Sequence, residues 1–474
     1  MIGRRTSRSR IRGLFLRLLG VVFLVAFLSL LAQVTLLFGS RGLLPAADYL
    51  RSTRGVVDAP TVFWIADGDG ALRAAAIAGA VLSFGLILNV APRYCLLLLW
   101  FLYLSFVTVG QEFFAFQWDN LLLESAFFSL FIAPGGLRPT RPPPPHPIAV
   151  FLMLWLVFRM HIESGAAKLL LGDPTWRDLT AMATYYETAP LPTWIGWWAH
   201  QMPLWGHRVT GGVVYLVELA LPFLMWGPRT VRTAVFAAMV AMQIAILLTA
   251  NYGFFNYLSI ALALFVLDDT HLGVPVAVAA DPPRRAAPLA VVAAVLVGLS
   301  AVQFLPLVPV ARPFEAALLP VRRVLSTFRS INAYHLFAHM TLVRREAVIE
   351  GSEDGTTWLP YEFRYKPGDP NRPPPFVAPH QPRVDFQLWF LLLGPQPGAR
   401  WFDALLDRLL TAPDVVAPLF ARDPFPVTPP RFVRVAIYRY RFTDRATHAA
   451  TGASWQRELQ GYSRPRSAGA LHGR

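Results

Sequence analysis

Ionisable side chains inside long apolar segments are the first residues of this sequence that could do chemistry. Arg159, Glu163 and Lys168 lie within one such segment. A charged group at membrane depth is costly, so each of them needs a partner or a function. Arg159 and Glu163 are four residues apart and share a helical face, where an ion pair would fix helix packing. Lys168 lies 2.5 helical turns beyond Arg159 and therefore on the opposite face.

The position of Lys168 has an ordinary structural explanation. Near the end of its apolar segment, its ammonium group can extend to the lipid headgroups as an anchor.

Other polar residues lie in apolar segments without forming a known catalytic motif. His161 has apolar neighbours and is expected to be a core histidine, not a ligand. The sequence has no metal-binding motif, nucleophile elbow or phosphate loop. Its single cysteine, Cys95, excludes an internal disulfide and a cysteine-based metal site. The remaining intramembrane candidates are Asp119, Asn120, Glu124, Glu218, Asn251 and Asn256.

The elements that carry these residues are predicted to be membrane helices. Hydrophobic residues make up 55% of the 474 residues and charged residues only 15%, against about 25% charged in soluble domains. Apolar runs predict a polytopic α-helical membrane protein with about nine spans. These are residues 14–38, 71–90, 94–109, 116–133, 148–171, 211–226, 231–250, 254–267 and 287–308.

The net charge of +14 is interpreted as a topology signal. No nucleic-acid-binding motif accompanies it, so we expect no nucleic-acid partner. Alternate loops between the apolar runs are basic, which predicts a cytoplasmic N-terminus and places the chain after about Ala311 outside the cytoplasm. The loop arginines are Arg93, Arg138, Arg141, Arg229, Arg232, Arg284 and Arg285.

The last third of the chain changes character. Residues 1–310 are predicted to form the membrane domain, residues 311–444 an extracytoplasmic β-rich domain, and residues 445–474 a flexible tail. Strand-like stretches, a hairpin signal at Glu353-Asp354-Gly355 and a short helix support the β-rich domain. The predicted strands are residues 341–349, 358–365, 385–393 and 432–442, and the predicted helix is residues 401–410.

Two loops are candidates for a binding surface. The loop 172–210 is rich in Trp and Tyr, which favour the headgroup layer. The loop 365–383 is so rich in proline that it can be neither helix nor central strand. It either braces the β-rich domain against the membrane helices or docks beside the aromatic loop as part of a surface for a partner protein. Its candidate residues are Lys366, Asp369, Arg372, His380 and Arg383.

Several of these segments resemble the lipase maturation factor family, over about residues 14–443. The resemblance implies a membrane-embedded maturation factor for exported proteins, whose client is an exported protein such as a lipase and which also contacts membrane lipid. Eukaryotic members reside in the endoplasmic reticulum and help secreted lipases to fold and dimerise. The segments that carry the resemblance are FQWDNLLLE (116–124), MHIESGAAK (160–168), DPTWRD (173–178), NYGFFN (251–256), VIEGS (348–352), YKPGD (365–369) and PHQPR (379–383).

A second segment is similar to another family. Gly165-Ala-Ala-Lys168-Leu followed by Trp176 looks like the segment of vitamin K-dependent gamma-carboxylase that carries its catalytic lysine, which falls on Lys168. This implies an alternative function as a membrane enzyme with Lys168 as its base, because desolvation can lower the pKa of a lysine at a membrane face. An enclosed cavity with other polar groups around Lys168 would favour the enzyme, and an open lipid-facing position would favour a scaffold. The sequence assigns no cofactor, and it identifies neither the client nor the oligomeric state.

The end of the chain and its composition predict a location. The sequence ends Leu471-His-Gly-Arg474, without an endoplasmic reticulum retention signal. It is rich in Ala, Arg and Pro, as chains from GC-rich bacteria often are. We therefore expect a bacterial plasma membrane.

Overall fold

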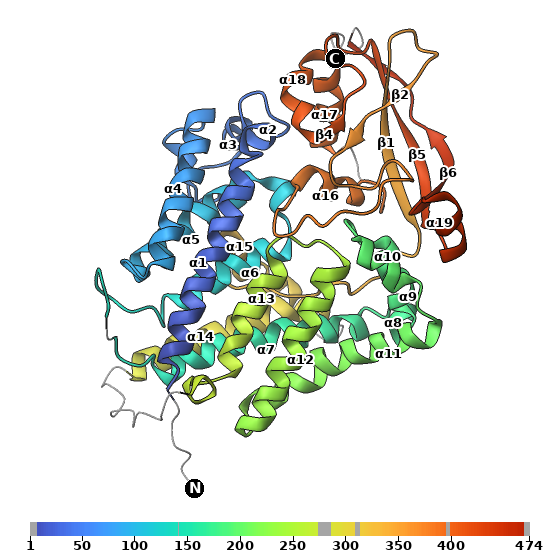
Figure 1. The fold of residues 1–474 in the computed structure, drawn as a ribbon. Coiled ribbons are helices and arrows are strands. Elements are labelled where there is room, and N and C mark those ends of the chain that lie inside the picture. Colours follow the sequence, from blue (N-terminus) through green and yellow to red (C-terminus); the bar gives the residue numbers. More distant parts are fainter. Residues whose placement is uncertain (1–6, 141, 274–285, 309–312, 395–398, 469–474) are drawn as a thin grey trace.

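Helices form most of the first 330 residues in the computed structural model, and a small antiparallel sheet follows them (Figure 1). The structure describes residues 7–140, 142–273, 286–308, 313–394 and 399–468. Arg141, Arg284, Arg285 and the predicted boundary at Ala311 lie outside the described residues.

Seven helices within the described residues are long and apolar enough to cross a membrane. They coincide with seven of the nine predicted spans and confirm a polytopic helical architecture. They are α1 (Ser9–Leu31), α4 (Asp69–Ile87), α5 (Pro92–Val109), α7 (Pro147–Leu170), α11 (Leu204–Tyr215) with its continuation to Trp226, α12 (Arg229–Thr249) and α14 (Ala286–Phe304) with its continuation to Leu307.

Two predicted spans form shorter helices, α6 (Gln117–Ser129) and α13 (Phe255–Ala263). A helix of 13 residues is only about 20 Å long, whereas the hydrocarbon core of a bilayer is about 30 Å thick. Both helices are packed inside the bundle, where Asp119, Glu124 and Asn256 are fully buried. Apolar composition alone does not distinguish such an interior helix from a membrane span.

The first predicted span is also shorter than expected. Helix α1 ends at Leu31, and a turn at Ala32 and Gln33 separates it from α2 (Val34–Phe38).

Helices α1 and α4 pack closely because Gly79 of α4 faces the Phe27 ring of α1. A Cβ at position 79 would lie 2.4 Å from a ring carbon, so this crossing requires glycine.

The β-rich domain contains a five-stranded antiparallel sheet in the order β2-β1-β5-β6, with β7 also pairing with β5. Strand β5 has the predicted bounds, and the predicted hairpin joins β1 to β2 with Gly355 in the left-handed conformation. The strands are β1 (Arg344–Ser352), β2 (Leu359–Pro360), β5 (Phe432–Phe442), β6 (Trp455–Tyr462) and β7 (Arg466–Ser467). A second pair is β3 (Glu362–Phe363) with β4 (Phe420–Arg422), and the predicted helix is α17 (Arg400–Thr411).

Two predictions for this domain are wrong. Residues 385–393 were predicted as a strand, but the chain forms helix α16 (Arg383–Phe390), which starts directly after Pro382. The predicted tail contains α19 (Arg445–Thr451) and the strand β6, which pairs with β5 over most of its length. The side chains of β6 after Trp455 are mostly exposed, so its polar sequence resembles a tail while backbone hydrogen bonds hold it in the sheet.

The two ends of α1 meet different parts of the chain. At its N-terminal end, Arg8 donates to the Leu267 carbonyl (2.8 Å) and Arg12 to the Pro143 carbonyl (2.8 Å). At its C-terminal end, Ser29 and Gln33 contact the loop 365–383 of the β-rich domain. The basic loops and the β-rich domain therefore lie at opposite ends of this helix (Figure 1).

Candidate functional site

Residues 330–340, which we call the strap, follow the amphipathic helix α15 (Glu315–Phe328) and run without regular structure along α7. Three side chains of α7 bind the strap backbone in succession. Arg159 Nη1 donates to the Asn332 carbonyl (2.8 Å), Glu163 Oε2 accepts the Tyr334 N–H (2.9 Å), and Lys168 Nζ donates to the Leu336 carbonyl (3.0 Å). Buried irregular backbone needs partners within the protein for its polar groups. Arg159, Glu163 and Lys168 supply such partners to the strap.

Arg159 is the centre of the first polar cluster. The predicted pair with Glu163 is present, with Nη1 3.5 Å from Oε1, but Arg159 Nη2 makes a closer contact with Glu124 of α6. Glu124 Oε2 also accepts the Asn332 N–H (2.9 Å) and the Tyr334 hydroxyl (2.8 Å). All five residues are buried. Two carboxylates thus share one guanidinium, and donors of the strap stabilise the second negative charge.

The ammonium group of Lys168 has a hydrogen-bond acceptor within the protein for each of its protons. Its ammonium nitrogen lies 2.7 Å and 3.0 Å from the two carboxylate oxygens of Glu218 and 3.2 Å from the Ser164 carbonyl. With the Leu336 carbonyl, these acceptors use all three protons of an ammonium group. The position is neither lipid-facing nor open to a substrate-sized space. Glu218 belongs to a π-helical turn (η3, Leu216–Ala220), which directs its carboxylate toward α7.

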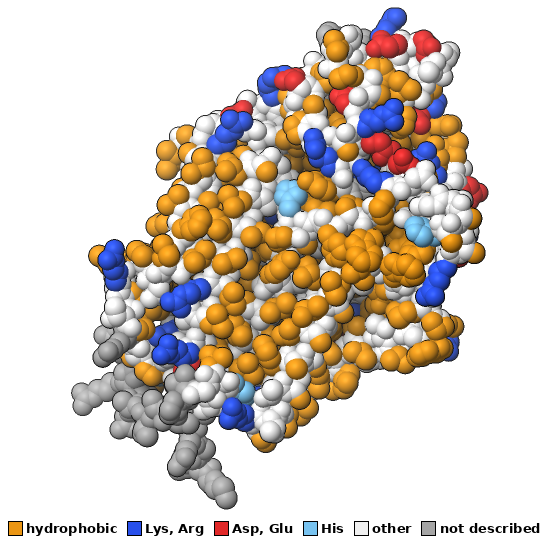
Figure 2. Space-filling view, viewed as in Figure 1, with side chains coloured by type: hydrophobic (Ala, Val, Ile, Leu, Met, Phe, Trp, Pro, Cys, Tyr) orange, Lys and Arg blue, Asp and Glu red, His pale blue; other side chains and the backbone are white. Residues whose placement is uncertain are grey.

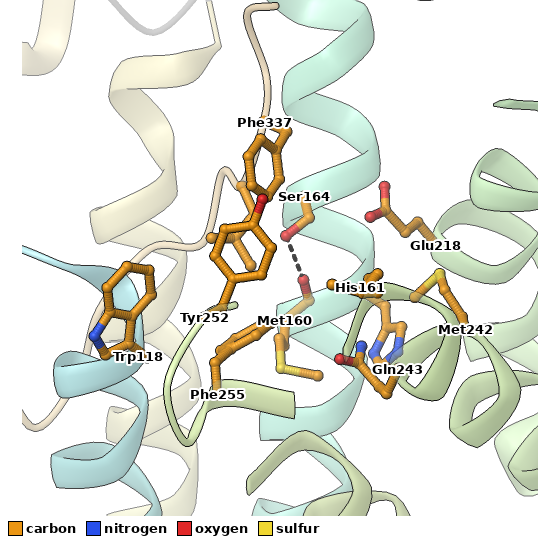
Figure 3. Close-up of a pocket in the computed structure, with 12 residues that line it drawn as sticks. Trp118, Met160, His161, Ser164, Glu218, Met242, Gln243, Tyr252, Phe255 and Phe337 are labelled. Carbon is orange, nitrogen blue, oxygen red and sulfur yellow. Dashed lines mark hydrogen bonds between the residues drawn. The ribbon is translucent and has the colours of Figure 1, made fainter. Parts of the chain in front are cut away.

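A small cavity lies beside these pairs, with side chains from α6, α7, α12 and the strap around it (Figure 3). Its volume is about 50 Å³, enough for a few water molecules. His161 Nδ1 lies 2.8 Å from the Val157 carbonyl, and its Nε2 has no hydrogen-bond partner among the described residues. Gln243, which lines the cavity, accepts a hydrogen bond from Asn256 of α13 (2.8 Å). His161 is buried and lines this cavity, and its role as a core histidine stays a prediction.

The loop 365–383 is tied to the membrane helices by a second group of buried side chains. Arg383 forms a two-point ion pair with Asp119 of α6, and Asp119 also accepts the Tyr103 hydroxyl (2.5 Å). Asn251, after α12, accepts the N–H groups of Val377 and Ala378. These contacts hold both ends of the segment from Val377 to Arg383 against the helical part of the chain.

The other candidate residues of the loop also make internal contacts. Ser29 of α1 lies 2.8 Å from His380 Nδ1, and Arg372 donates to the Phe363 and Lys366 carbonyls. Asp369 is exposed and accepts the Asn371 N–H within a local turn. Asn120 of α6, which the sequence grouped with the buried candidates, accepts a hydrogen bond from Arg329, the residue before the strap (3.3 Å).

Sequence reasoning missed four residues that hold the site together: Asn332, Tyr334, Arg344 and Glu346. Glu346 lies between Arg344 (2.5 Å) and Lys366 (2.8 Å), and all three are buried. Arg344 also donates to the carbonyls at the end of α9 (Ala181–Thr188) and in the following loop. Arg344 and Glu346 are two residues apart in strand β1, so their side chains lie on the same face of the sheet. A positive and a negative residue two positions apart in a predicted strand are the sequence signal that could have identified this pair.

Asp385 fixes the end of the loop through backbone contacts. Its Oδ1 accepts the N–H groups of Tyr365 and Lys366, both at 3.0 Å. Burial of this carboxyl group raises its pKa from 3.8 to about 6, although the two N–H groups and the nearby Lys366 and Arg372 act in the opposite direction. Deprotonated Asp385 therefore costs the folded state free energy at neutral pH.

Exposed aromatic rings lie beside these buried braces. Trp194 is 48% exposed and Phe376 is 46% exposed, and their ring centroids are 6.0 Å apart. Trp198 of the same helix, α10 (Trp194–His200), lies next to the exposed Arg445 of α19. We call Trp194, Trp198 and Phe376 the aromatic face. In the space-filling view, hydrophobic side chains cover the bundle and continue up to the β-rich domain (Figure 2).

Comparison with known proteins covers both parts of the chain. A family model described as the lipase maturation factor transmembrane domain matches residues 10–274, and one described as the lipase maturation factor C-terminal domain matches residues 330–465. Lipase maturation factor 2 of Gallus gallus is 33% identical over 94% of this chain and 80% of its own length. The human protein of that name is also 33% identical, over 94% and 81%. Lipase maturation factor 1 of Bos taurus is 32% identical, over 98% and 90%. No solved structure gives a significant match.

These relatives correct two expectations from the sequence. They come from chicken, human and cow, which contradicts the prediction of a bacterial plasma membrane, while membrane association is supported by the transmembrane family model. The comparisons also give no support to the gamma-carboxylase alternative. The matches span the membrane helices and the β-rich domain alike, so the chain belongs to the lipase maturation factor family.

Proposed function

We propose that this chain promotes the maturation of a lipase client and that the aromatic face is where the client binds. The observation that carries the proposal is the contact between Trp194 and Phe376. It joins the aromatic loop to the proline-rich loop, and both rings remain half exposed above a buried, ion-paired base. A client that is not yet fully folded exposes apolar surface, and exposed aromatic rings bind such surface well.

The base beneath the aromatic face is rigid. Helix α10 is joined to the end of β5 because Trp197 Nε1 donates to Thr443 Oγ1 (3.3 Å) and Gln201 donates to the Thr443 carbonyl (3.1 Å). The other side of the face is fixed by Asn251, which binds the backbone at Pro375, Val377 and Ala378. Holding both rings in place before binding reduces the entropy that a client must overcome.

The buried charges support a scaffold in preference to an enzyme. A base needs a nitrogen free to accept a proton, and Lys168 is surrounded by acceptors, including both oxygens of Glu218. Arg159 and Arg383 are likewise engaged by carboxylates within the protein. In this proposal, the intramembrane residues and the loop residues Lys366, Arg372, His380 and Arg383 support the client surface from below without touching the client.

The proposal also includes an orientation. The aromatic face and the β-rich domain lie on the non-cytoplasmic side of the membrane, where an exported lipase folds. The opposite placement of the basic loops, at the N-terminal end of α1, supports this orientation because basic loops are retained in the cytoplasm.

A secretion assay tests the proposed function. The chain is co-expressed with a secreted lipase in cells that lack their own lipase maturation factors, and lipase activity is measured per amount of secreted lipase protein. Wild type should raise this specific activity, and the double variant W194A/F376A should lose most of the gain. Trp226 is 47% exposed at the end of the α11 continuation, so W226A is a matched control and should behave as wild type. No gain with wild type, or equal loss in W226A, would contradict the proposal.

A further inference from the structure

A basic pocket lies at the end of the bundle away from the β-rich domain. Its volume is about 530 Å³, and it is lined by Arg12, Arg93, His146 and residues 131–140 and 142–145, which include Arg138. None of its described lining residues is Asp or Glu. A pocket of this size can hold a phosphate-bearing headgroup. Figure 2 shows several Lys and Arg side chains near this end of the molecule.

The backbone around the pocket is held in place by Arg93, which also supplies part of its charge, and by Asn89 and Ala91. Arg93 Nε and Nη2 both donate to the Ala133 carbonyl (3.2 and 2.6 Å), which leaves Nη1 available. Asn89 donates to the Pro139 carbonyl (3.1 Å), and the Ala91 N–H donates to the Leu137 carbonyl (2.8 Å). The loop after α6 is thereby fastened to the turn between α4 and α5. The pocket is a built feature of the fold.

Arg12 gives the pocket an unbalanced buried charge. Its side chain is 4% exposed, and its one hydrogen bond among the described residues is to the Pro143 carbonyl. The neighbouring carboxylate of Asp269 accepts the N–H groups of Arg10 and Ile11, and no ion pair joins it to Arg12 within the described residues. A buried guanidinium without a carboxylate partner is costly unless another anion compensates it.

The surroundings of the pocket favour a lipid as the source of that anion. Arg93 lines the pocket, and the next residues of α5 that face outward are Tyr94, Leu97 and Leu98. Leu88 at the end of α4 is 71% exposed. Acyl chains of a lipid whose phosphate lies in the pocket can therefore lie along the apolar outer surfaces of α4 and α5. Basic pockets between membrane helices on the cytoplasmic side are known to bind anionic headgroups.

We propose that this pocket binds the phosphate group of an anionic phospholipid, with Arg12 at its base and Arg93 and Arg138 at its rim. The site is independent of the client surface, because it lies at the other end of α1. Its ligand neutralises Arg12 and anchors the basic end of the bundle in the cytoplasmic leaflet.

Native mass spectrometry of the full-length protein in mild detergent tests the proposal, with dioleoylphosphatidylglycerol, dioleoylphosphatidylcholine and inorganic phosphate as separate probes. Wild type should bind the anionic lipid more tightly than the zwitterionic one. In the variant R93Q/R138Q, the ratio of anionic-lipid to zwitterionic-lipid affinity should fall about 25-fold, which is roughly fivefold for each arginine. Both side chains are exposed, but Arg93 also holds the Ala133 carbonyl, so the melting temperature in detergent checks that the fold is retained.

The matched control is R54Q/R431Q. It removes two exposed arginines that have no partner among the described residues and lie elsewhere in the chain, and it should keep the wild-type preference. If both variants lost the same amount of lipid preference, the preference would depend on net charge alone, and the proposed site would be overturned. No preference in wild type would also overturn it. Binding of inorganic phosphate as tightly as the lipid would show a free-anion site and contradict the assignment to a lipid.

Discussion

Arg383 and Asp119 form a buried two-point ion pair, with Nη1 2.7 Å from Oδ2 and Nη2 2.8 Å from Oδ1, although 264 residues separate them in the chain. Asp119 lies on an interior helix of the membrane domain, and Arg383 begins the first helix after the proline-rich loop. The guanidinium also covers the Phe114 ring at 3.7 Å. One pair thus connects the two parts of the molecule that the family models match separately.

Removing Arg383 should therefore destabilise the whole protein. The variant R383L leaves the Asp119 carboxylate buried without its partner, with a cost on the order of 3–5 kcal/mol. The double variant D119L/R383L should recover much of that loss. Thermal unfolding in detergent measures both. The exposed pair of Arg51 with Asp48 is the control, because R51L should change stability by less than about 1 kcal/mol. Equal effects of R383L and R51L would contradict the buried pair.

The cluster at Arg159 predicts unequal effects of two similar substitutions. Glu124 accepts from Arg159, Asn332 and Tyr334, whereas Glu163 lies 3.5 Å from Arg159 and accepts one strap N–H. E124Q should therefore lower the melting temperature more than E163Q. R159L should lower it further, since it leaves two carboxylates buried. An unchanged melting temperature in R159L would show that the cluster does not hold the strap.

Lys168 allows the scaffold and the enzyme to be separated. K168M leaves Glu218 buried without a cation and should lower both stability and lipase maturation. The double variant K168M/E218L removes both charges and should restore stability and maturation together. Should stability return while maturation stays lost, Lys168 would have a chemical role that the scaffold account does not include. The same secretion assay and detergent melting measure the two quantities.

Much of the fold could be predicted from the sequence because apolar run length reports directly on membrane helices. The buried candidates Asp119, Arg159, Glu163 and Lys168 could also be found, since charges in apolar runs are rare. Apart from the Arg159–Glu163 pair, their partners could not be predicted. Asn332 and Tyr334 lie in an irregular strap whose backbone is the partner, and neither periodicity nor composition indicates where an irregular segment runs.

The same limit applied to the two misassigned segments. Residues 385–393 alternate like a strand, but Asp385 binds two backbone N–H groups of the preceding loop and fixes the start of a helix. Strand β6 has mostly exposed side chains after Trp455, so it lacks an apolar pattern. Tertiary contacts decided both segments, and they involve residues far away in the sequence.

Asp385 predicts a specific pH dependence. Because burial raises its pKa to about 6 from 3.8, the folded state holds this proton more tightly than the unfolded state. The free energy of unfolding contributed by Asp385 should be fully present below about pH 4 and fall as the pH rises through 6. D385N keeps an oxygen to accept the two N–H groups and should remove that decline, which amounts to at most about 3 kcal/mol for two pKa units. Melting temperatures of both proteins between pH 4 and 7.5 measure the difference, and identical pH profiles would contradict it.

Photocrosslinking tests the client surface most directly. A photoreactive p-benzoylphenylalanine replaces Trp194, Trp198 or Phe376 in separate variants, and Trp226 in a fourth, and each is irradiated in cells that co-express a secreted lipase. The account predicts crosslinks to the newly made lipase from the three positions of the aromatic face and none from position 226. Crosslinks to the lipase from position 226 with none from the aromatic face would contradict it.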